Sequence, residues 1–362
     1  MIALQCRLDC SPGYVAHKTP IITCVKGRYQ PQDPNTFKCT PAAALIISSE
    51  GEVEIFSKNK KCNQKVVKFS GFGGEGRSLD LLDDQLILLG EEHLGGRFEY
   101  KSIHQPRKGL LGMKLSLEAS PLLFSRHSSF AWGNHLLAIG GDSQSKAKLS
   151  NSVWWRSNLR WQNGSQFNRL STGACRVKME KDVFFLIGGF EEVNGIRVEM
   201  STVLRLNVTE GIVTEFPAMN TSRAFHACEV TGQRILISGG IQDDRIPADE
   251  VYNVETKTSH ALEVTSSLGR QQHSLLRIED TIFAFGGLLS NKSATSSVEW
   301  FDWNETKWKP HDHSLISEHT GSLALTPFPL SSVDCHTGCS CGRKNIPENA
   351  RIIGGSPSQV VQ

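Results

Sequence analysis

The sequence predicts an all-β fold, a six-bladed β-propeller of four-stranded antiparallel blades that is closed by a C-terminal strand. Two observations predict it. Apolar runs ending in glycine pairs recur with a period near 50 residues, and four short strand-like segments fit into each period. Because one such sheet cannot bury both of its faces, we expect the sheets to stack around a common axis.

The glycine pairs are the most regular feature of the chain. Their first glycines are residues 140, 188, 239 and 286, so the steps are 48, 51 and 47 residues. Each preceding run is short and rich in β-branched and aromatic residues, as expected of a buried strand. Glycine there allows a positive φ or the close approach of a neighbouring backbone. The pairs are Gly140 and Gly141, Gly188 and Gly189, Gly239 and Gly240, and Gly286 and Gly287.

Two weaker copies of the run bring the number of repeats to six. Gln85–Glu91 keeps one glycine, and Leu45–Ser49 keeps none. The first repeat lacks an opening strand, while a strand-like run, Ser322–Thr326, follows the last one. We expect residues 320–326 to pair with residues 43–48 and close the ring, which would leave no open sheet edge. Glu52–Phe56 alternates between polar and apolar residues and is expected to be a half-buried strand.

Further positions recur around each glycine pair. A histidine stands thirteen residues before the first glycine at His127, His226 and His273. Since rotation about the axis would separate these histidines, we expect hydrogen bonds between strands and no metal site. A second strand is expected at Val153, Val203, Val251 and Val298, and a last one at Trp161 and Trp308. The aromatic pairs Trp154–Trp155 and Trp300–Trp303 are expected to pack in the blades, although stacking on a sugar is the alternative.

These features resemble the kelch-repeat family over roughly residues 43–327. The glycine pairs, the valine segments after them and the later tryptophans carry the resemblance. In that family the loops between strands form a binding face, which implies a protein or glycan ligand here. The corresponding irregular segments are Asp142–Leu149, Phe190–Val198 and Ile241–Pro247. Some kelch proteins are copper oxidases with tyrosine and histidine ligands, but the four tyrosines of this chain do not support that chemistry, so we expect no cofactor.

Composition favours an extracellular protein that binds neither nucleic acid nor membrane. The 39 basic and 37 acidic residues give a net charge of +2, and no apolar stretch is long enough for a membrane helix. Ten cysteines cluster mainly at the two ends, as in disulfide-linked secreted modules. No secretory leader is visible, so we expect the true start to lie upstream of Met1. Five candidate glycosylation sites add to this expectation: Asn163, Asn207, Asn220, Asn291 and Asn304.

Residues 1–40 contain Cys6, Cys10, Cys24 and Cys39, and about forty residues cannot hold a core without disulfides. The pattern Cys10-Ser-Pro-Gly-Tyr followed by Cys24-x-x-Gly-x-Tyr resembles the C-terminal half of a sushi module. That resemblance implies a bridge between Cys10 and Cys39, with the partners of Cys6 and Cys24 upstream. An unrelated disulfide knot is the alternative.

Three further cysteines and one glycine-rich stretch receive structural interpretations. Cys62 lies in a polar turn and is expected to be a solitary thiol. Cys175 and Cys228 stand in similar runs on neighbouring blades, where we expect two buried free thiols, with a bridge between them as the alternative. Gly71–Gly76 lacks the strand, helix and Lys-Ser/Thr of a nucleotide loop and is expected to connect two blades.

The end of the chain resembles the activation segment of a trypsin-like protease zymogen. Cys341-Gly342, a short polar link, and Arg351 followed by Ile352-Ile-Gly-Gly match in order. The resemblance implies cleavage between Arg351 and Ile352 by an activating trypsin-like protease. It also implies a disulfide from Cys341 to a missing catalytic domain. The catalytic triad would lie beyond Gln362, so this chain is expected not to be an enzyme, although its parent would be a serine endopeptidase.

We therefore expect the recognition region of a secreted protease zymogen. Its parts are a partial sushi module (1–40), the propeller (41–328), a cysteine-containing linker with the activation peptide (329–351), and the first residues of a trypsin-like domain (352–362). A stand-alone secreted kelch binding protein and an intracellular kelch adaptor remain alternatives. The sequence leaves open the ligand of the propeller and the oligomeric state.

Overall fold

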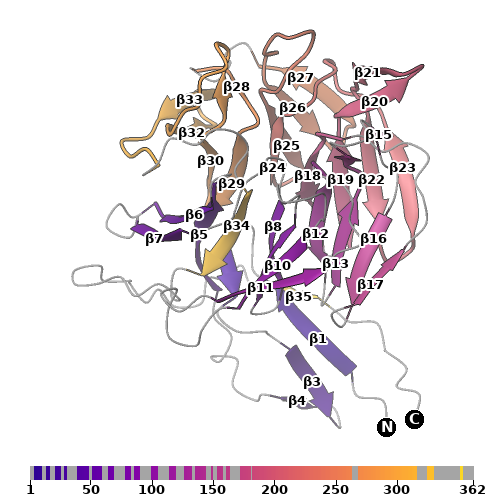
Figure 1. Cartoon of the computed structure of the whole chain (residues 1–362). Helices are drawn as coiled ribbons and strands as arrows, with labels where there is room; N and C mark the ends of the chain where they lie inside the picture. The colour runs from indigo at the N-terminus through magenta and orange to yellow at the C-terminus, as the bar shows by residue number, and fades with distance from the viewer. Residues whose placement is uncertain are drawn as a thin grey trace.

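The computed structural model describes residues 39–48, 51–58, 126–132, 135–143, 172–180, 182–262 and 268–315, together with the strands named below that lie outside these ranges (Figure 1). Every regular element in this part of the chain is a β-strand. The expected all-β class is therefore confirmed. No helix among the described residues is long and apolar enough to cross a lipid bilayer.

Most strands form four-stranded antiparallel sheets, which we number in chain order. Sheet 2 contains β8 (Ser78–Leu82), β9 (Gln85–Leu89), β10 (Glu99–His104) and β11 (Lys114–Ala119). Sheet 3 contains β12 (Ser128–Trp132), β13 (His135–Ile139), β16 (Val153–Ser157) and β17 (Arg160–Asn163). Sheet 4 contains β18 (Cys175–Lys178), β19 (Val183–Ile187), β22 (Val203–Asn207) and β23 (Ile212–Phe216).

The last two sheets repeat this order of strands. Sheet 5 contains β24 (Ala227–Thr231), β25 (Arg234–Ser238), β26 (Glu250–Asn253) and β27 (Thr258–Ala261). Sheet 6 contains β29 (Ser274–Ile278), β30 (Thr281–Phe285), β32 (Val298–Asp302) and β33 (Lys307–Pro310). The strands expected before and after each glycine pair are present in sheets 3 to 6. Trp161 and Trp308 lie in the outer strands β17 and β33.

Sheet 1 joins the two ends of the repeat region. It contains β5 (Cys39–Ile47), β6 (Glu52–Phe56) and β7 (Gln64–Lys68), and β34 (Ala324–Pro329) pairs with β5 on the side away from β6. The pairing is antiparallel, from Ala324 opposite Ile47 to Pro329 opposite Ala42. The expected contact between the tail strand and residues 43–48 is therefore present. In Figure 1 the yellow β34 lies beside the indigo β5.

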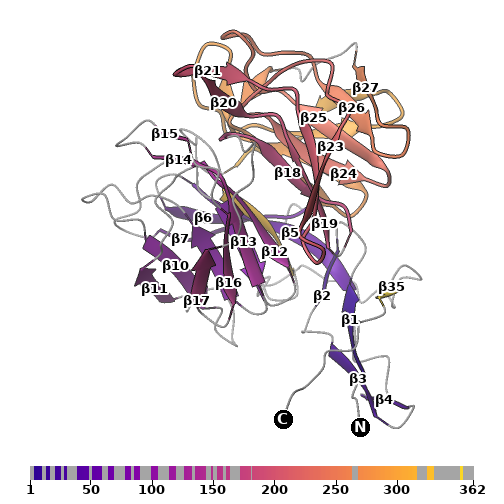
Figure 2. The ribbon, with the colours of Figure 1, turned by 90° about the vertical axis from the view of Figure 1, so that its right-hand side faces the viewer.

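The first strands of the sheets lie next to one another in a closed order. β8 lies next to β34 and β12, β18 next to β12 and β24, and β29 next to β24 and β34. Apolar clusters fill the space between neighbouring sheets; in one, Phe130 and Leu137 of sheet 3 pack with Phe184 and Leu186 of sheet 4. Figures 1 and 2 show the sheets standing side by side, and the arrangement is consistent with a β-propeller.

Stacking on both sides explains one wrong expectation. β6 was expected to be half-buried, but all residues from Val53 to Phe56 are buried, including Glu54 with 2% of its surface exposed. A strand between two neighbouring sheets buries both faces, so a polar residue in the alternation is enclosed as well. The second strands of the sheets are enclosed in the same way: every residue of β19 is buried, as are the residues of β5 from Ala42 to Ile47.

Smaller elements complete the description. A sheet near the N-terminus contains β1 (Leu4–Asp9), β3 (Ile21–Val25), β4 (Arg28–Gln30) and β35 (Arg351–Ile353), and β2 (Tyr14–Ala16) pairs with the start of β5. Three two-stranded ribbons are β14 (Asp142–Ser143) with β15 (Lys148–Leu149), β20 (Phe190–Val193) with β21 (Ile196–Glu199), and β28 (Arg270–Gln271) with β31 (Leu288–Leu289). The predicted Cys10–Cys39 bridge, Cys62, Gly71–Gly76 and Cys341 involve positions or side chains outside the described residues.

Candidate binding face

The antiparallel order of the strands divides the connections between two faces. Successive turns of an up-and-down sheet lie at opposite ends. The segments that follow the glycine pairs therefore share one end with the connections from each sheet to the next. We call this end the loop face and the other end, with turns such as residues 254–257, the turn face. The segments predicted to bind a ligand all belong to the loop face.

The glycine pairs hold neighbouring sheets together beneath the loop face. All eight glycines have positive φ. A Cβ on Gly239 would overlap the carbonyl oxygen of Arg270 and approach Cε1 of His273 to 3.0 Å, both from the next sheet. A Cβ on Gly240 would lie 2.6 Å from the Ala224 carbonyl oxygen. The expectations of positive φ and of close backbone approach are therefore both confirmed.

The repeat histidines fill the space that these glycines leave. His127 Nε2 lies 2.9 Å from Ser78 Oγ of the preceding sheet, which confirms the expected hydrogen bond between strands. For His273 the expectation is wrong, because its ring nitrogens make no hydrogen bond with the described residues. The His226 ring approaches the Ile187 backbone of the preceding sheet but makes no hydrogen bond of normal geometry there. Instead His226 Cε1 lies where Gly188 of the preceding sheet would carry a Cβ. Burial lowers the pKa of both imidazoles, and that of His273 falls to about 3.

Two buried arginines stand three residues before these histidines. Arg223 donates hydrogen bonds to the Gly239 carbonyl at 3.1 Å and to Glu250 Oε1 at 2.6 Å. Arg270 repeats the arrangement one sheet later, with the Gly286 carbonyl at 2.7 Å and Glu299 Oε2 at 2.9 Å. Both guanidinium groups are fully buried. The sequence analysis missed them, although the spacing Arg-x-x-His in two successive repeats is a signal that could have found them.

A chain of backbone hydrogen bonds links four successive sheets where their first strands begin. The amide of Gly173 donates to the Arg126 carbonyl, that of Phe225 to the Gly173 carbonyl, and that of Gln272 to the Phe225 carbonyl. All four residues have positive φ, between 54° and 68°. Because each bond joins one sheet to the next, the repeat fixes the spacing of the loops above it.

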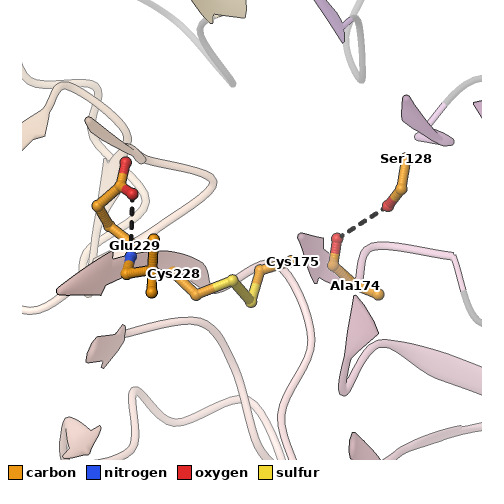
Figure 3. The surroundings of a disulfide bond; sticks show 6 residues. Ser128, Ala174, Cys175, Cys228 and Glu229 are labelled. Atoms are coloured by element: carbon orange, nitrogen blue, oxygen red, sulfur yellow. Dashed lines mark hydrogen bonds between the residues drawn. A yellow bond between two sulfur atoms is a disulfide. The ribbon is translucent and has the colours of Figure 1, made fainter. Parts of the chain in front are cut away.

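A disulfide links sheets 4 and 5, which corrects the expectation of free thiols. Cys175 of β18 and Cys228 of β24 are bonded, with Cα atoms 5.7 Å apart (Figure 3). Their similar positions in successive repeats bring first strands of neighbouring sheets within bonding distance, which sequence separation alone did not indicate. Glu229, next to Cys228, accepts the Arg277 amide of sheet 6 at 3.1 Å. Burial raises the pKa of this carboxyl to about 7.

A polar chain connects the first strands of sheets 2, 3 and 4. Ser78 Oγ contacts His127 Nε2 and Ser129 Oγ, and Ser129 Oγ also contacts the Asp80 carboxylate. Arg176 lies 3.6 Å from that carboxylate. Since both serines are buried, the Ser–His contact is not placed for attack on a substrate. In the described part of the chain no three His, Cys, Asp or Glu side chains gather in an arrangement that could hold a metal ion.

The loop face itself is better ordered than the term irregular implies. Phe190–Val198 lies largely in the hairpin of β20 and β21, and Asp142–Leu149 begins and ends in the ribbon of β14 and β15. In Ile241–Pro247, Gln242 and Arg245 pair through both backbone hydrogen bonds, around two aspartates at positive φ. The described parts of these segments are therefore held at defined positions.

Other predicted residues lie in various places. Asn220, Asn291 and Asn304 are exposed, and Asn207 is half-buried at the end of β22. The side-chain Nδ2 of Asn220 donates to the Ser259 carbonyl at 2.9 Å. Asn163 ends β17, and its side chain is outside the described residues. Of the aromatic residues, Trp154, Trp300 and Trp303 pack against core clusters as expected, while Trp155 is 38% exposed.

Similarity to known proteins is limited to part of the chain. No family model matches it. Over 103 aligned residues it is 29% identical to Kelch-like protein 15 of Homo sapiens, and 28% identical to the proteins of that name from Mus musculus and Rattus norvegicus. The match covers 26% of this chain and only 17% of the human protein. It gives no support to the sushi-like or protease-like segments, which stay predictions. Together with the repeated sheets, this partial similarity supports kelch repeats in the chain.

Proposed function

We propose that this chain is the recognition region of a secreted modular protein. In this proposal sheets 1 to 6 are the six blades of a closed kelch-type propeller, and the loop face binds a protein or glycan ligand. The observation that carries it is the closed order of first strands, which returns through β29 to β34. A closed ring pairs the inner end of every sheet with its neighbours and leaves only the short outer strands as edges. Loops on such a rigid scaffold are where binding residues concentrate.

The disulfide and the sequons favour an extracellular protein. Disulfides between buried cysteines persist in oxidising compartments and are rare in the cytosol. Asn207 and Asn304 lie at turns of the turn face, so glycans there would leave the loop face open, whereas a glycan on Asn291 would stand on the loop face beside Lys292. The similarity to Kelch-like protein 15, in contrast, fits the intracellular adaptor, which is therefore the second candidate function.

Peptide mapping of the protein from its natural source distinguishes these candidates. Thiols are alkylated at lysis, and the digest is analysed without reduction. The secreted protein yields a linked peptide containing Cys175 and Cys228, and a glycan on Asn304. The intracellular adaptor yields both cysteines alkylated and Asn304 unmodified.

The protease context is a separate part of the proposal. Cleavage after Arg351 would free the amino group of Ile352, as the resemblance to a zymogen activation segment implies. Arg351–Ile353 forms β35, which pairs with β1, so a protease would have to displace this pairing before cutting. Sequencing the transcript beyond the codon of Gln362 tests this part. A downstream trypsin-like domain with a Ser/His/Asp triad is expected, and a stop codon there would exclude the zymogen in favour of the stand-alone binding protein.

Binding by the loop face is tested with peptides selected from a random phage-displayed library on the whole chain. The double variant Arg245→Glu, Lys292→Glu changes two exposed charges of the loop face. We expect it to change the affinity of the selected peptides at least about fivefold. Lys257→Glu is the matched control, because Lys257 is exposed and at positive φ, as Lys292 is, but lies in the turn face. Equal binding to all variants would place the ligand elsewhere.

A further inference from the structure

We propose that the hairpin of β20 and β21 is a docking arm for an extended partner segment that carries aliphatic side chains together with Lys or Arg. The inference rests on the proposed binding role of the loop face and specifies its chemistry. The hairpin projects beyond the sheets in two views (Figures 1 and 2). Its residues bear more exposed apolar surface than any other described segment of the loop face.

The register of the hairpin separates its side chains into two faces. Asn194 and Gly195 form the two-residue turn, both at positive φ, as such tight hairpins require. Val193 lies opposite Ile196, and Glu191 lies opposite Val198. Because side chains alternate along a strand, these four share one face, and three of them are aliphatic. The sequence Val-Asn-Gly-Ile was a signal for this hairpin that the sequence analysis did not use.

The aliphatic face is exposed, whereas the base of the hairpin is fixed. The exposed fractions are 47% for Val193, 66% for Ile196 and 40% for Val198. At the base, Phe190 is buried and packs edge-on against Phe225, with ring centroids 5.2 Å apart. Thr172 exchanges backbone hydrogen bonds with Phe190. A two-stranded ribbon cannot bury its own faces, so an anchored ribbon with an aliphatic face is a ready surface for a partner.

The charge around this face selects the partner. Phe190–Glu199 and Ile241–Pro247 contain five carboxylates and two arginines, a net charge of 2 − 5 = −3, although the whole chain is at +2. The bases of the two segments meet, because Ile241 pairs with Ala224, next to Phe225. Complementary potentials favour a basic partner and discriminate against an acidic one. A second copy of this chain would bring two acidic arms together, which like-charge repulsion disfavours.

An extended segment suits the geometry. Alternate side chains of such a segment point to one side, so its aliphatic residues can cover Val193, Ile196 and Val198 while a Lys or Arg on the same side reaches Glu191. Glu191 shares the aliphatic face, Glu192 and Glu199 lie on the opposite face of the hairpin, and Asp243 and Asp244 belong to the neighbouring segment.

The test compares the whole chain with the triple variant Val193→Thr, Ile196→Thr, Val198→Thr. Threonine keeps the β-branched shape, so the strands are retained while the face becomes polar. Random peptides selected on the natural protein are expected to combine aliphatic residues with a net positive charge and to bind the triple variant at least tenfold more weakly. Ile212→Thr is the matched control, since Ile212 is 51% exposed on β23, the outer strand of sheet 4, from which the hairpin projects. Equal thermal midpoints for both variants establish that folding is unchanged; if the triple variant melts lower, Ile196→Thr alone replaces it.

The outcomes are distinguishable. Peptides that are acidic, or that bind the triple variant and the natural protein equally, would overturn the docking arm. If such peptides still respond to Arg245→Glu, Lys292→Glu, the loop face binds as proposed and only the inference fails; if they respond to neither, both fail. Sedimentation velocity tests whether a second copy of this chain occupies the arm. A dimer in the natural protein that the triple variant abolishes would assign the arm to that second copy and overturn the proposal.

Discussion

At Gly239 the missing side chain sets how closely sheets 5 and 6 approach. Gly239→Ala would force a Cβ into the Arg270 carbonyl and keep a residue with a side chain at a φ of 58°. We expect it to lower the free energy of unfolding by about 3 kcal/mol, of which about 1 kcal/mol comes from the backbone conformation. Chemical denaturation measures the difference.

Gly232→Ala is the control for this prediction. Gly232 has the same φ of 58°, but a Cβ there would meet no atom within 4 Å. It should lose only the conformational part, about 1 kcal/mol. Equal losses at both positions would mean that the contact between sheets does not constrain Gly239.

His273 makes stability depend on pH. Its folded pKa of about 3 lies below the ordinary value of 6.5, since burial disfavours the imidazolium and Arg270 adds repulsion. The unfolded chain therefore binds more protons below pH 6.5. The contribution of neutral His273 to the free energy of unfolding is fully present above pH 6.5. It is lost as the pH falls toward 3, at up to about 1.4 kcal/mol per pH unit.

Between pH 6.5 and pH 5 the unfolding free energy of the natural protein should fall. In His273→Gln we expect this fall to be smaller by about 2 kcal/mol. His226, whose pKa is also lowered by burial, would account for part of the remaining slope. His260→Gln, at an exposed position of β27, is the control. An unchanged slope in His273→Gln would show that this imidazole is not enclosed as described.

Removing one partner of the Arg270–Glu299 pair is expected to lower the free energy of unfolding strongly, whereas replacing both residues is expected to lower it little. Glu299→Gln leaves a buried guanidinium without its counter-charge, which should cost about 3–5 kcal/mol. The double variant Arg270→Met, Glu299→Leu removes both charges and should recover most of that loss. Denaturant melts of the single and double variants measure the coupling, and additive losses would contradict a fully desolvated pair.

At the scale of elements, the disulfide fastens β18 to β24. Cys175 and Cys228 are 53 residues apart, and the chain-entropy relation gives about 4 kcal/mol for closing a loop of that size. We expect Cys175→Ala, Cys228→Ala to lose about this much, and the natural protein to lose a similar amount in reducing buffer. Stability that is insensitive to reductant would mean that the two thiols are not bonded in solution.

The strands were predictable where local pattern and environment agree. The runs before the glycine pairs are short, apolar and bounded by turns, and they became β13, β19, β25 and β30. The prediction for β6 was wrong because alternation of polar and apolar residues normally indicates one solvent-exposed face, whereas here Glu54 is enclosed between sheets. Burial on both faces is a property of stacking, which a single strand's pattern does not contain.

At the scale of the molecule, the period of the repeat predicted neighbouring sheets but not the contacts between them. Hence the pairing of β34 with β5 could be expected, while the bond between Cys175 and Cys228 could not. The sequence favoured free core thiols over a bridge, because it does not show how closely equivalent positions of neighbouring sheets approach. On the first strands, however, adjacent sheets approach closely enough for a bond. The candidate binding segments were found from the repeat, but the aliphatic face of the hairpin needed the observed register.

Closure of the ring is the central claim, and hydrogen–deuterium exchange of residues 42–47 tests it most directly. A chain ending at Ser322 lacks β34. A chain ending at Ser331 is the control, because it retains β34 and lacks only residues 332–362, which the first truncation removes as well. We predict slow exchange of residues 42–47 in the full chain and in the chain ending at Ser331. The chain ending at Ser322 should exchange much faster there, because the amides paired with β34 become exposed at a sheet edge. Identical protection in all three would contradict a ring that is closed by the tail strand.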